Sequence, residues 1–453
     1  MRKFDLIIIG TGSGNSIIGP EHDDWDIALV ERGLFGGTCL NVGCIPSKMF
    51  VYAAEIAELA AKVGPALGVD TQMNGIDWPQ IRDRVFGRID PIAAGGEDYR
   101  KSLDHVTVFQ HDARFVGPKA LKVGDETITA DHIVIAAGAR SFIPDIPGLA
   151  EAGFHTSDSI MRVDELPGRI AVLGGGYIAT ELGNVFGQFG TDVTFILRGD
   201  RMLRGEDHEV SDRFTEIYTQ KFRTCINTNV LSAHRDGTEI VLELESNGEI
   251  SELRVDEVLV ATGRIPNGDQ LEVEACGVEL DERGYVVTDA NLRTAVDGVW
   301  ALGDITNPLQ LKHAANHEAR VVAHNLTNPG SMIEADHRFL PHAVFGHPQV
   351  AGVGLTEQRC IDQGRPYIAH TQAYGSAAYG WAMEDTESFA KVIADPDTRQ
   401  LIGAHIIGPQ ASTLIQQLIQ AMTFGQTVDQ LAREQYYIHP GLPEVIEQAL
   451  LEL

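Results

Sequence analysis

Hydrophobic positions along the chain fall into short apolar runs and into longer runs with helical spacing. The short runs, each ending at small or polar residues, are 4–9, 27–30, 133–138, 169–173, 193–197, 258–263 and 299–304. Strands that are buried on both faces of a parallel sheet have this pattern. Apolar residues recur at helical spacing in 51–62, 76–103 and 313–327. The alternation predicts an α/β fold built on doubly wound parallel sheets.

The pattern changes at about residue 336. Strands are predicted at 344–353, 389–394 and 401–407, and helices at 409–424 and 428–434. This last part has no glycine-rich phosphate loop, so we expect a separate α+β domain. Prolines and glycine at 144–148 indicate a linker earlier in the chain. The expected domains are a discontinuous first domain (1–150 and 266–335), a second domain (151–265) and a third domain (336–453).

A glycine-rich turn follows the first apolar run directly. Gly10 permits a tight turn, Gly12 lets the backbone approach a pyrophosphate, and Gly14 follows in the same spacing. The phosphates would then lie at the N-terminus of the following helix. Glu31, at the end of the next strand, can accept hydrogen bonds from both hydroxyls of an adenosine ribose. Asn15 occupies a position usually held by Gly or Ala, so we expect the helix to begin at a different angle.

A second dinucleotide-binding pattern begins after the strand at 169–173. Gly174 and Gly176 open a Gly-x-Gly-x-x-Ala turn, and the next strand ends at Arg198 instead of an acid. Arg201 and Arg204 follow closely. A carboxylate at that strand end would bind a 2′-hydroxyl, whereas a guanidinium pairs with a 2′-phosphate. The alternative is a solvated basic face, but the placement favours recognition of a 2′-phosphate.

Three further strands end in small-residue turns. Gly138 and Gly263 close two of them, and Gly303-Asp304 closes the third. Asp304 is well placed to bind a polyol or ribityl hydroxyl. The alternative is that Asp304 is a helix N-cap.

Two cysteines lie close together after the second strand. Cys39 and Cys44 follow Gly36 and Gly37 and precede Pro46. In a regular helix their Cα atoms would be roughly 7.5 Å apart, but a disulfide requires roughly 4.4–6.8 Å. A bridge therefore needs a distorted first turn, and strained bridges are the catalytic or labile ones. The spacing favours a redox pair over two unrelated thiols or half of a metal site.

The C-terminal segment contains a His-Pro turn followed by an acid. His439 and Glu444 can form an acid–base pair in which the carboxylate orients the imidazole. Taken alone, a His-Pro segment is more often only a turn.

Length, charge and cysteine content limit the possible classes of protein. The 453 residues are enough for about three domains. The net charge of −29 argues against nucleic acid or an anionic membrane surface as a partner. Five cysteines do not form a secreted disulfide framework. No apolar run approaches the roughly 18 residues of a membrane span, and no signal peptide is recognisable. We therefore expect a cytoplasmic protein.

Together these motifs resemble the flavin-dependent pyridine nucleotide–disulfide oxidoreductases over essentially the whole chain. The resemblance implies an FAD-binding first domain, an NADPH-binding second domain and a homodimer formed by the third. It also implies that Cys44 lies next to the flavin and that Cys39 attacks a small-molecule disulfide substrate. His439 and Glu444 would reach across the dimer into the partner's site. The remaining residues that the resemblance assigns to the flavin and nucleotide sites are Lys48 and Glu181 as a pair, Tyr177 over the nicotinamide, Thr38 and Ile178.

The side-chain charges near the expected pocket and the resemblance to one branch of the family limit the range of possible substrates. Arg198 and Arg204 resemble the NADPH-linked branch that includes glutathione reductase, although Gly441 replaces the Thr of that branch. Residues 49–61 contain no Lys or Arg, and they supply carboxylates at Glu55 and Glu58. Arg100 and Lys101 are expected nearby, but they adjoin the acidic Glu97 and Asp98. Such a surface suits hydroxyl-rich rings better than the carboxylates of glutathione disulfide.

Three segments are similar to the branch that reduces mycothione, the disulfide of a cysteinyl glucosamine–inositol thiol. These segments are 10–15, 48–55 and 438–447. Tyr99 is the expected substrate-covering residue, the alternative being a core aromatic on a helix. Other possibilities are an NAD-linked dihydrolipoamide dehydrogenase within a multienzyme complex, a glutathione or mercuric reductase, and a redox-inactive flavoprotein scaffold.

Overall fold

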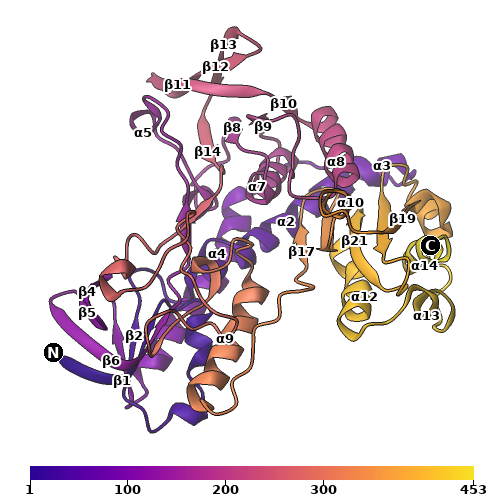
Figure 1. The fold of residues 1–453 in the computed structure, drawn as a ribbon. Coiled ribbons are helices and arrows are strands. Elements are labelled where there is room, and N and C mark those ends of the chain that lie inside the picture. The colour runs from indigo at the N-terminus through magenta and orange to yellow at the C-terminus, as the bar shows by residue number, and fades with distance from the viewer. The chain divides into compact units, whose positions relative to one another are not determined.

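The computed structural model describes residues 1–453 (Figure 1). The chain forms two compact units. Unit 1 comprises 1–49, 78–142 and 263–337, and unit 2 comprises 50–77, 143–262 and 338–453. The α/β class with parallel sheets is confirmed, whereas the three domain boundaries stay a prediction. None of the helices combines the length and apolarity needed to cross a membrane.

Unit 1 is built on a seven-stranded sheet in the order β3-β2-β1-β6-β5-β4, with β16 also paired to β6. β3, β2, β1, β6 and β16 run parallel, and β4 and β5 are antiparallel. Ile7 and Ile8 point into separate apolar clusters, so the sheet is buried on both faces. Its strands are β1 (Arg2–Ile9), β2 (Ile27–Val30), β3 (Val106–Phe109), β4 (Ala113–Gly117), β5 (Ala120–Val123), β6 (Glu126–Ile135) and β16 (Val299–Ala301).

Other elements of unit 1 connect these strands. A small antiparallel pair consists of β7 (Ala139–Ser141) and β15 (Arg264–Pro266). The helices are α1 (Gly37–Asn41), the start of α2 (Cys44–Glu58), α4 (Trp78–Lys101) and α9 (Lys312–Thr327). Short 3-10 turns are η1 (Gly14–Ile17), η2 (Pro20–His22), η4 (Val273–Cys276) and η5 (Gly303–Ile305).

The helix expected after the first glycine-rich turn is absent, and this prediction is wrong. The chain forms only η1 and η2, because Gly19 and Pro20 interrupt the segment and proline lacks a backbone N–H. The Arg100 side chain bonds oxygen atoms of this segment, among them backbone carbonyls that a regular helix would have bonded. Its Nε donates to Asn15 Oδ1 at 2.8 Å and its Nη2 donates to the Asn15 carbonyl at 2.8 Å.

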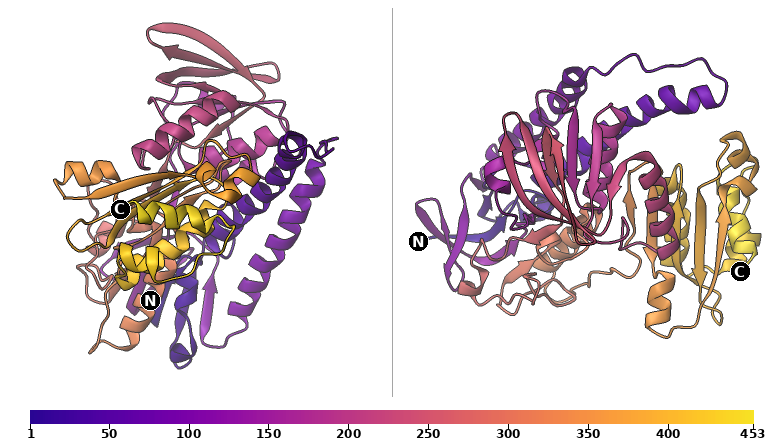
Figure 2. Two further views of the ribbon diagram at one scale, coloured as in Figure 1. Left: turned by 90° about the vertical axis from the view of Figure 1, so that its right-hand side faces the viewer. Right: turned by 90° about the horizontal axis from the view of Figure 1, so that it is seen from above.

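Unit 2 contains a parallel sheet in the order β10-β9-β8-β14 and an antiparallel sheet β11-β12-β13, visible in pink in the left view of Figure 2. These strands are β8 (Arg169–Leu173), β9 (Asp192–Ile196), β10 (Arg223–Cys225), β11 (Thr228–Asp236), β12 (Glu239–Ser246), β13 (Glu249–Val255) and β14 (Glu257–Val260). The helices with them are α5 (Leu149–Ala152), α6 (Ser157–Ile160), α7 (Tyr177–Gln188) and α8 (His208–Lys221). The segment after α2 forms the π-helical turn η3 (Leu59–Val63) and α3 (Gly64–Ala66).

The C-terminal part of unit 2 is an antiparallel sheet in the order β17-β18-β21-β20-β19. Its strands are β17 (His342–Val344), β18 (Val350–Gly354), β19 (Ile368–Ala373), β20 (Phe389–Ala394) and β21 (Leu401–Ile407). The single strand predicted at 344–353 is thus wrong: a turn containing Gly346 and Pro348 divides it. The helices are α10 (Glu357–Asp362), α11 (Ala378–Ala382), α12 (Ala411–Phe424), α13 (Val428–Arg433) and α14 (Pro443–Leu451), with the 3-10 turn η6 (Tyr374–Ser376). α12, α13 and α14 share one apolar core with the strands.

Candidate active site

The first glycine-rich loop of unit 1 has the geometry expected of a dinucleotide site. Gly10 has φ of 103°, and a Cβ there would lie 2.4 Å from the Ala136 carbonyl oxygen, so only glycine fits. A Cβ on Gly14 would lie 2.7 Å from the Ala136 side chain. A Cβ on Gly12, in contrast, would have no other atom within 4 Å. The loop is packed where it leaves β1 and open where a pyrophosphate would bind, so it fits FAD.

The loop of unit 2 repeats this geometry. Gly174 has φ of 122°, and its Cβ would lie 2.4 Å from the Ala261 carbonyl oxygen. Gly176 faces open space and immediately precedes α7, which begins at Tyr177 and Ile178. The two loops therefore have the same backbone geometry, and the second loop also fits a dinucleotide.

Glu31 connects the first loop to the segment that leads to the cysteines. Its carboxylate accepts hydrogen bonds from Thr11 N at 3.0 Å, Thr11 Oγ1 at 2.6 Å and Gly33 N at 2.9 Å. The Thr11 hydroxyl in turn accepts a hydrogen bond from Gly36 N at 2.9 Å. The structure thus places Glu31 at the edge of the dinucleotide loop, while its contact with a ribose stays a prediction. Thr11 was missed, because a threonine inside a glycine-rich motif has no signal of its own.

Cys39 and Cys44 lie on either side of a break between two helices. Cys39 belongs to α1, Cys44 begins α2, and Val42 between them has φ of −142° and ψ of 13°. This interruption is the distorted turn that the spacing required. A Cβ on Gly37 would lie 2.8 Å from Gly12 Cα, so the cysteine segment packs directly against the first dinucleotide loop.

Both cysteines are thiols in the structure, and they interact. The hydrogen bond with Cys44 and then burial raise the pKa of the Cys39 thiol, whereas the charge of Lys312 acts in the opposite direction. Because its pKa is raised, the Cys39 thiol needs a nearby base to ionise.

Lys312 and Glu318 of α9 were missed by the sequence analysis. Lys312 Nζ donates to Ser13 Oγ at 2.9 Å, beside the first loop. The buried Glu318 carboxylate accepts hydrogen bonds from Gly303 N at 2.6 Å and Asn307 Nδ2 at 3.2 Å. Their only sequence signal is their position on the helix that follows the Gly-Asp motif.

Asp304 lies in the second position of η5, whose N-cap is Leu302, so the N-cap alternative is not observed. Burial raises the pKa of the Asp304 carboxyl. A carboxyl in this environment can bind a hydroxyl, which is consistent with its expected contact to a ribityl chain.

Gly138 and Gly263 lie in turns at the ends of two strands. Gly138 has φ of 65° and Gly263 has φ of 131°, and both face open space. Thr38, in α1, is exposed. Their contacts with a cofactor stay predictions.

The three arginines after β9 differ in their surroundings. Arg201 Nη1 lies 2.9 Å from Asp212 Oδ1, so this side chain is already paired. Arg198 and Arg204 are exposed, and neither forms an ion pair. This leaves the two residues expected at a 2′-phosphate available to bind one.

Lys48 and Glu181 lie in different units. The Lys48 side chain is half-buried near the start of α2, and the Glu181 carboxylate is buried in α7, where it accepts a hydrogen bond from Phe345 N at 3.0 Å. Their expected pairing beside the flavin stays a prediction.

His439 and Glu444 form a pair near the C-terminus. His439 Nδ1 lies 2.7 Å from Glu444 Oε1, and Gly441 N donates to Glu444 Oε2 at 3.1 Å. These two contacts lower the pKa of the Glu444 carboxyl. A Cβ at position 441 would lie 2.9 Å from the Ile438 carbonyl oxygen, which explains why Gly441 suits this turn. The His439 side chain is 74% exposed, so its ring is accessible to another molecule.

The surface expected to contact substrate requires two corrections. Glu58 does not face a substrate, because its buried carboxylate lies 2.8 Å from Lys221 Nζ. Arg100 is likewise buried against Asn15, and it is not a cation near the substrate. Tyr99 is 58% exposed, so it is not a core aromatic. Its contact with substrate stays a prediction.

Comparisons with known proteins extend this description. Residues 4–319 match the model of the pyridine nucleotide-disulphide oxidoreductase family, and residues 340–450 match the dimerisation domain of the same family. Mycothione reductase of Mycobacterium tuberculosis is 46% identical over 466 aligned residues that cover 100% of both chains.

More distant relatives include mercuric reductase of Staphylococcus aureus, 33% identical over 94% of this chain and 78% of its own. Dihydrolipoyl dehydrogenase of Haloferax volcanii is 32% identical over 98% of this chain and 95% of its own. Among solved structures, the Cu(II) complex of the HOCl-induced flavoprotein disulfide reductase RclA from Escherichia coli aligns with a TM-score of 0.87 at 27% identity. That alignment covers 100% of both chains.

Proposed function

Because the chain belongs to the pyridine nucleotide-disulphide oxidoreductase family, we propose that it reduces mycothione with electrons from NADPH. At the level of the family it is an enzyme, an FAD- and NAD(P)H-dependent disulfide oxidoreductase. The observation that carries the proposal is the Cys39–Cys44 pair, held across a helix break against the first dinucleotide loop.

The residues of the chain divide between two nucleotide sites. The loop from Gly10 to Gly14, Glu31 and Asp304 would hold FAD. The loop from Gly174 to Gly176, with Arg198 and Arg204, would hold NADPH. When bound, FAD supplies a two-electron relay between the nicotinamide and the Cys39–Cys44 disulfide.

The two cysteines then perform thiol–disulfide exchange. Two electrons open the Cys39–Cys44 bond, and the Cys39 thiolate attacks one sulfur of the substrate disulfide. The substrate S–S bond breaks, a Cys39–substrate bond forms, and the first thiolate leaves with a proton. The Cys44 thiolate then attacks Cys39 Sγ, which releases the second thiol and restores the Cys39–Cys44 disulfide. In total one disulfide, two electrons and two protons give two thiols.

Proton transfer requires an acid–base group that the cysteine segment lacks. The raised pKa of Cys39 means that the thiol needs a base to ionise. The His439 ring is exposed, and the Glu444 carboxylate already orients it. We infer that His439 of the partner subunit accepts the Cys39 proton and returns it to the leaving thiol.

The choice of substrate rests on charge and on similarity. Residues 49–61 contain no cationic side chain. Arg100 is buried, so it adds no cation to the surface expected to contact substrate. Exposed Tyr52 and Tyr99 and half-buried Glu55 supply hydrogen-bonding groups for sugar and inositol hydroxyls. The full-length similarity to a mycothione reductase supports the same substrate.

Turnover of a substrate panel tests the proposal. Mycothione, glutathione disulfide, lipoamide and Hg²⁺ should each be assayed with NADPH and with NADH. We expect kcat/KM to be highest for mycothione with NADPH, by at least about tenfold over glutathione disulfide. Comparable values for these two disulfides would overturn the substrate assignment.

A further inference from the structure

The segment that follows β9 is tightly folded around the two available arginines. Leu203 N donates to the Gly175 carbonyl at 2.8 Å, which fastens the segment to the second dinucleotide loop. The Arg204 side chain folds back against Gly199. Its Nη1 lies 3.1 Å from the position that a Cβ on Gly199 would occupy. Gly199 is the neighbour of Arg198 in the chain. We refer to residues 198–207 as the arginine loop.

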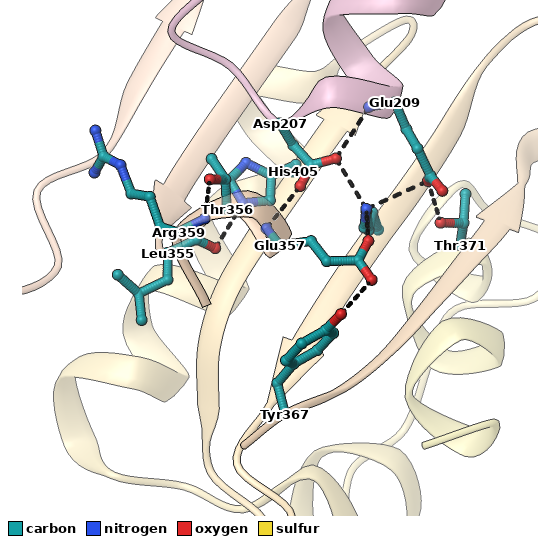
Figure 3. Close-up of polar contacts among 10 residues, drawn as sticks. Asp207, Glu209, Leu355, Thr356, Glu357, Arg359, Tyr367, Thr371 and His405 are labelled. Atoms are coloured by element: carbon teal, nitrogen blue, oxygen red, sulfur yellow. Dashed lines mark hydrogen bonds and ion pairs between the residues drawn. The ribbon is translucent and has the colours of Figure 1, made fainter. Parts of the chain in front are cut away.

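The end of the arginine loop is fixed to the C-terminal sheet by two carboxylates. Glu206 pairs with His342 of β17, at 2.9 and 2.8 Å from its two oxygens to Nε2. Asp207 Oδ1 accepts a hydrogen bond from Lys391 Nζ of β20 at 2.9 Å (Figure 3). Only Gly205 separates these anchors from Arg204.

Asp207 is also the N-cap of α8. Its Oδ1 accepts a hydrogen bond from Glu209 N at 3.2 Å, and its Oδ2 accepts one from Glu357 N at 2.9 Å. The residue therefore fixes both the end of the loop and the start of the helix.

Lys391 is the cation that lies among the carboxylates of Asp207, Glu209 and Glu357. Its side chain is 2% exposed, and Asp207 is fully buried. Nζ hydrogen-bonds Asp207 and Glu357, and it lies 3.5 Å from Glu209 Oε2. Burial alone would lower the pKa of Lys391, but the hydrogen bonds with Glu357 and Asp207 raise it above the ordinary value. Without this ammonium, Asp207 would lose the cation that opposes the effect of burial, and the pKa of its carboxyl would rise.

Two outer contacts hold the carboxylates in place around Lys391. The Tyr367 hydroxyl donates to Glu357 Oε1 at 2.9 Å, and the Thr371 hydroxyl donates to Glu209 Oε2 at 2.7 Å (Figure 3). Both come from the C-terminal part of the chain, so the arginine loop is held from outside its own sheet.

We propose that Lys391 is a positioning residue for nucleotide selectivity: it fixes the arginine loop so that Arg198 and Arg204 can bind the 2′-phosphate of NADPH. This inference rests on the proposed use of NADPH. Lys391 touches no nucleotide in this account, and it acts through Asp207.

The alternative is that Lys391 only ties α8 to the sheet. The other end of α8 supplies a matched control, because the mostly covered Lys221 there pairs with Glu58 at 2.8 Å. Lys221 is far along the helix from the arginine loop. Its loss should loosen α8 without affecting Arg198 or Arg204.

Calorimetric binding of two probes to the FAD-loaded protein separates these possibilities. Adenosine 2′,5′-bisphosphate contains the 2′-phosphate, and 5′-AMP lacks it. For Lys391→Met we expect at least about tenfold weaker binding of the bisphosphate and 5′-AMP binding within about twofold of wild type. In turnover, KM for NADPH should rise while kcat at saturating NADPH is unchanged. Lys221→Met should leave both affinities at wild-type values.

A double variant guards against misfolding of Lys391→Met. Asp207→Asn with Lys391→Met removes the buried charges together, and asparagine still caps α8. The same selective loss is expected. If wild type binds both probes equally, the proposed NADPH preference is wrong. If wild type discriminates but the Lys391 variants retain this preference, or Lys221→Met loses it equally, the role of Lys391 is wrong.

Discussion

Cationic side chains in this chain have different roles according to the carboxylates within their reach. Arg201 is paired with Asp212, whereas Arg198 and Arg204 remain exposed. Buried Lys391 is surrounded by carboxylates, whereas the mostly covered Lys221 has one close carboxylate, that of Glu58. A sequence motif gives the residue type, but these contacts decide whether the charged group is available to a ligand or is held within the fold.

Lys221 should make stability depend on alkaline pH. Burial lowers its pKa from 10.5 to about 8, despite the opposing charge of Glu58. Between these values the unfolded chain binds more protons, so the free energy of unfolding should rise with pH across the window. Below pH 8 the cost of holding the charged lysine is fully present. The expected change is about 3 kcal/mol between pH 8 and 10.5.

Urea unfolding at fixed protein concentration measures this effect. The reference is the double variant Glu58→Gln with Lys221→Met, which lacks the titrating pair but keeps all other groups. Wild type should gain stability relative to the variant as pH rises from 8 to 10.5. Parallel pH profiles for the two proteins would contradict the assignment.

At the scale of elements, the break between α1 and α2 and the loop after β1 form one packed feature. Gly37 permits it, because the residue has φ of 70° and its Cβ position lies against the Gly12 backbone. Glu31 and Thr11 add hydrogen bonds between the same two segments. The geometry of the cysteines and that of the expected FAD site are therefore coupled.

Gly37→Ala should separate these segments and weaken FAD binding. The added methyl group would meet backbone at 2.8 Å, beyond the roughly 1–3 kcal/mol cost of a positive φ. Gly237→Ala is the matched control, since Gly237 has φ of 63° and open space around it. We expect a lower ratio of flavin to protein absorbance for purified Gly37→Ala only. Equal FAD content in both variants would show that the contact is dispensable.

Elements were predictable where a local pattern decides them. The bounds of β2, β8, β20 and β21 agree with the predicted runs, because buried strands are mostly apolar and end at polar or small residues. The sheet β11–β13 was missed because β11 and β13 are mostly exposed and mix polar and charged residues with apolar ones, so neither is an apolar run. Glycine spacing predicted both dinucleotide loops. Lys391 could not be found in this way, because its partner Asp207 lies 184 residues away in the sequence.

At the scale of the whole molecule, the residues proposed to take part in thiol–disulfide exchange and proton transfer belong to different units. Cys39 and Cys44 belong to unit 1, and His439 and Glu444 belong to unit 2. Tyr436, Ile438 and His439 are all largely exposed, as a segment that contacts a second chain would be. Residues 340–450 match a dimerisation domain. These observations support a site completed by the partner subunit.

Mixing two inactive variants tests this shared site. Cys39→Ser and His439→Gln should each abolish turnover in their own homodimers. In a heterodimer, Cys39 of the second chain meets His439 of the first, so one of its two sites is intact. Isolated heterodimers should therefore regain about half of wild-type activity, and a random mixture about a quarter. Pairing Cys39→Ser with a chain that carries both substitutions is the control, and it should remain inactive. Recovery in neither mixture would place the acid–base pair and the cysteines of one site in the same chain.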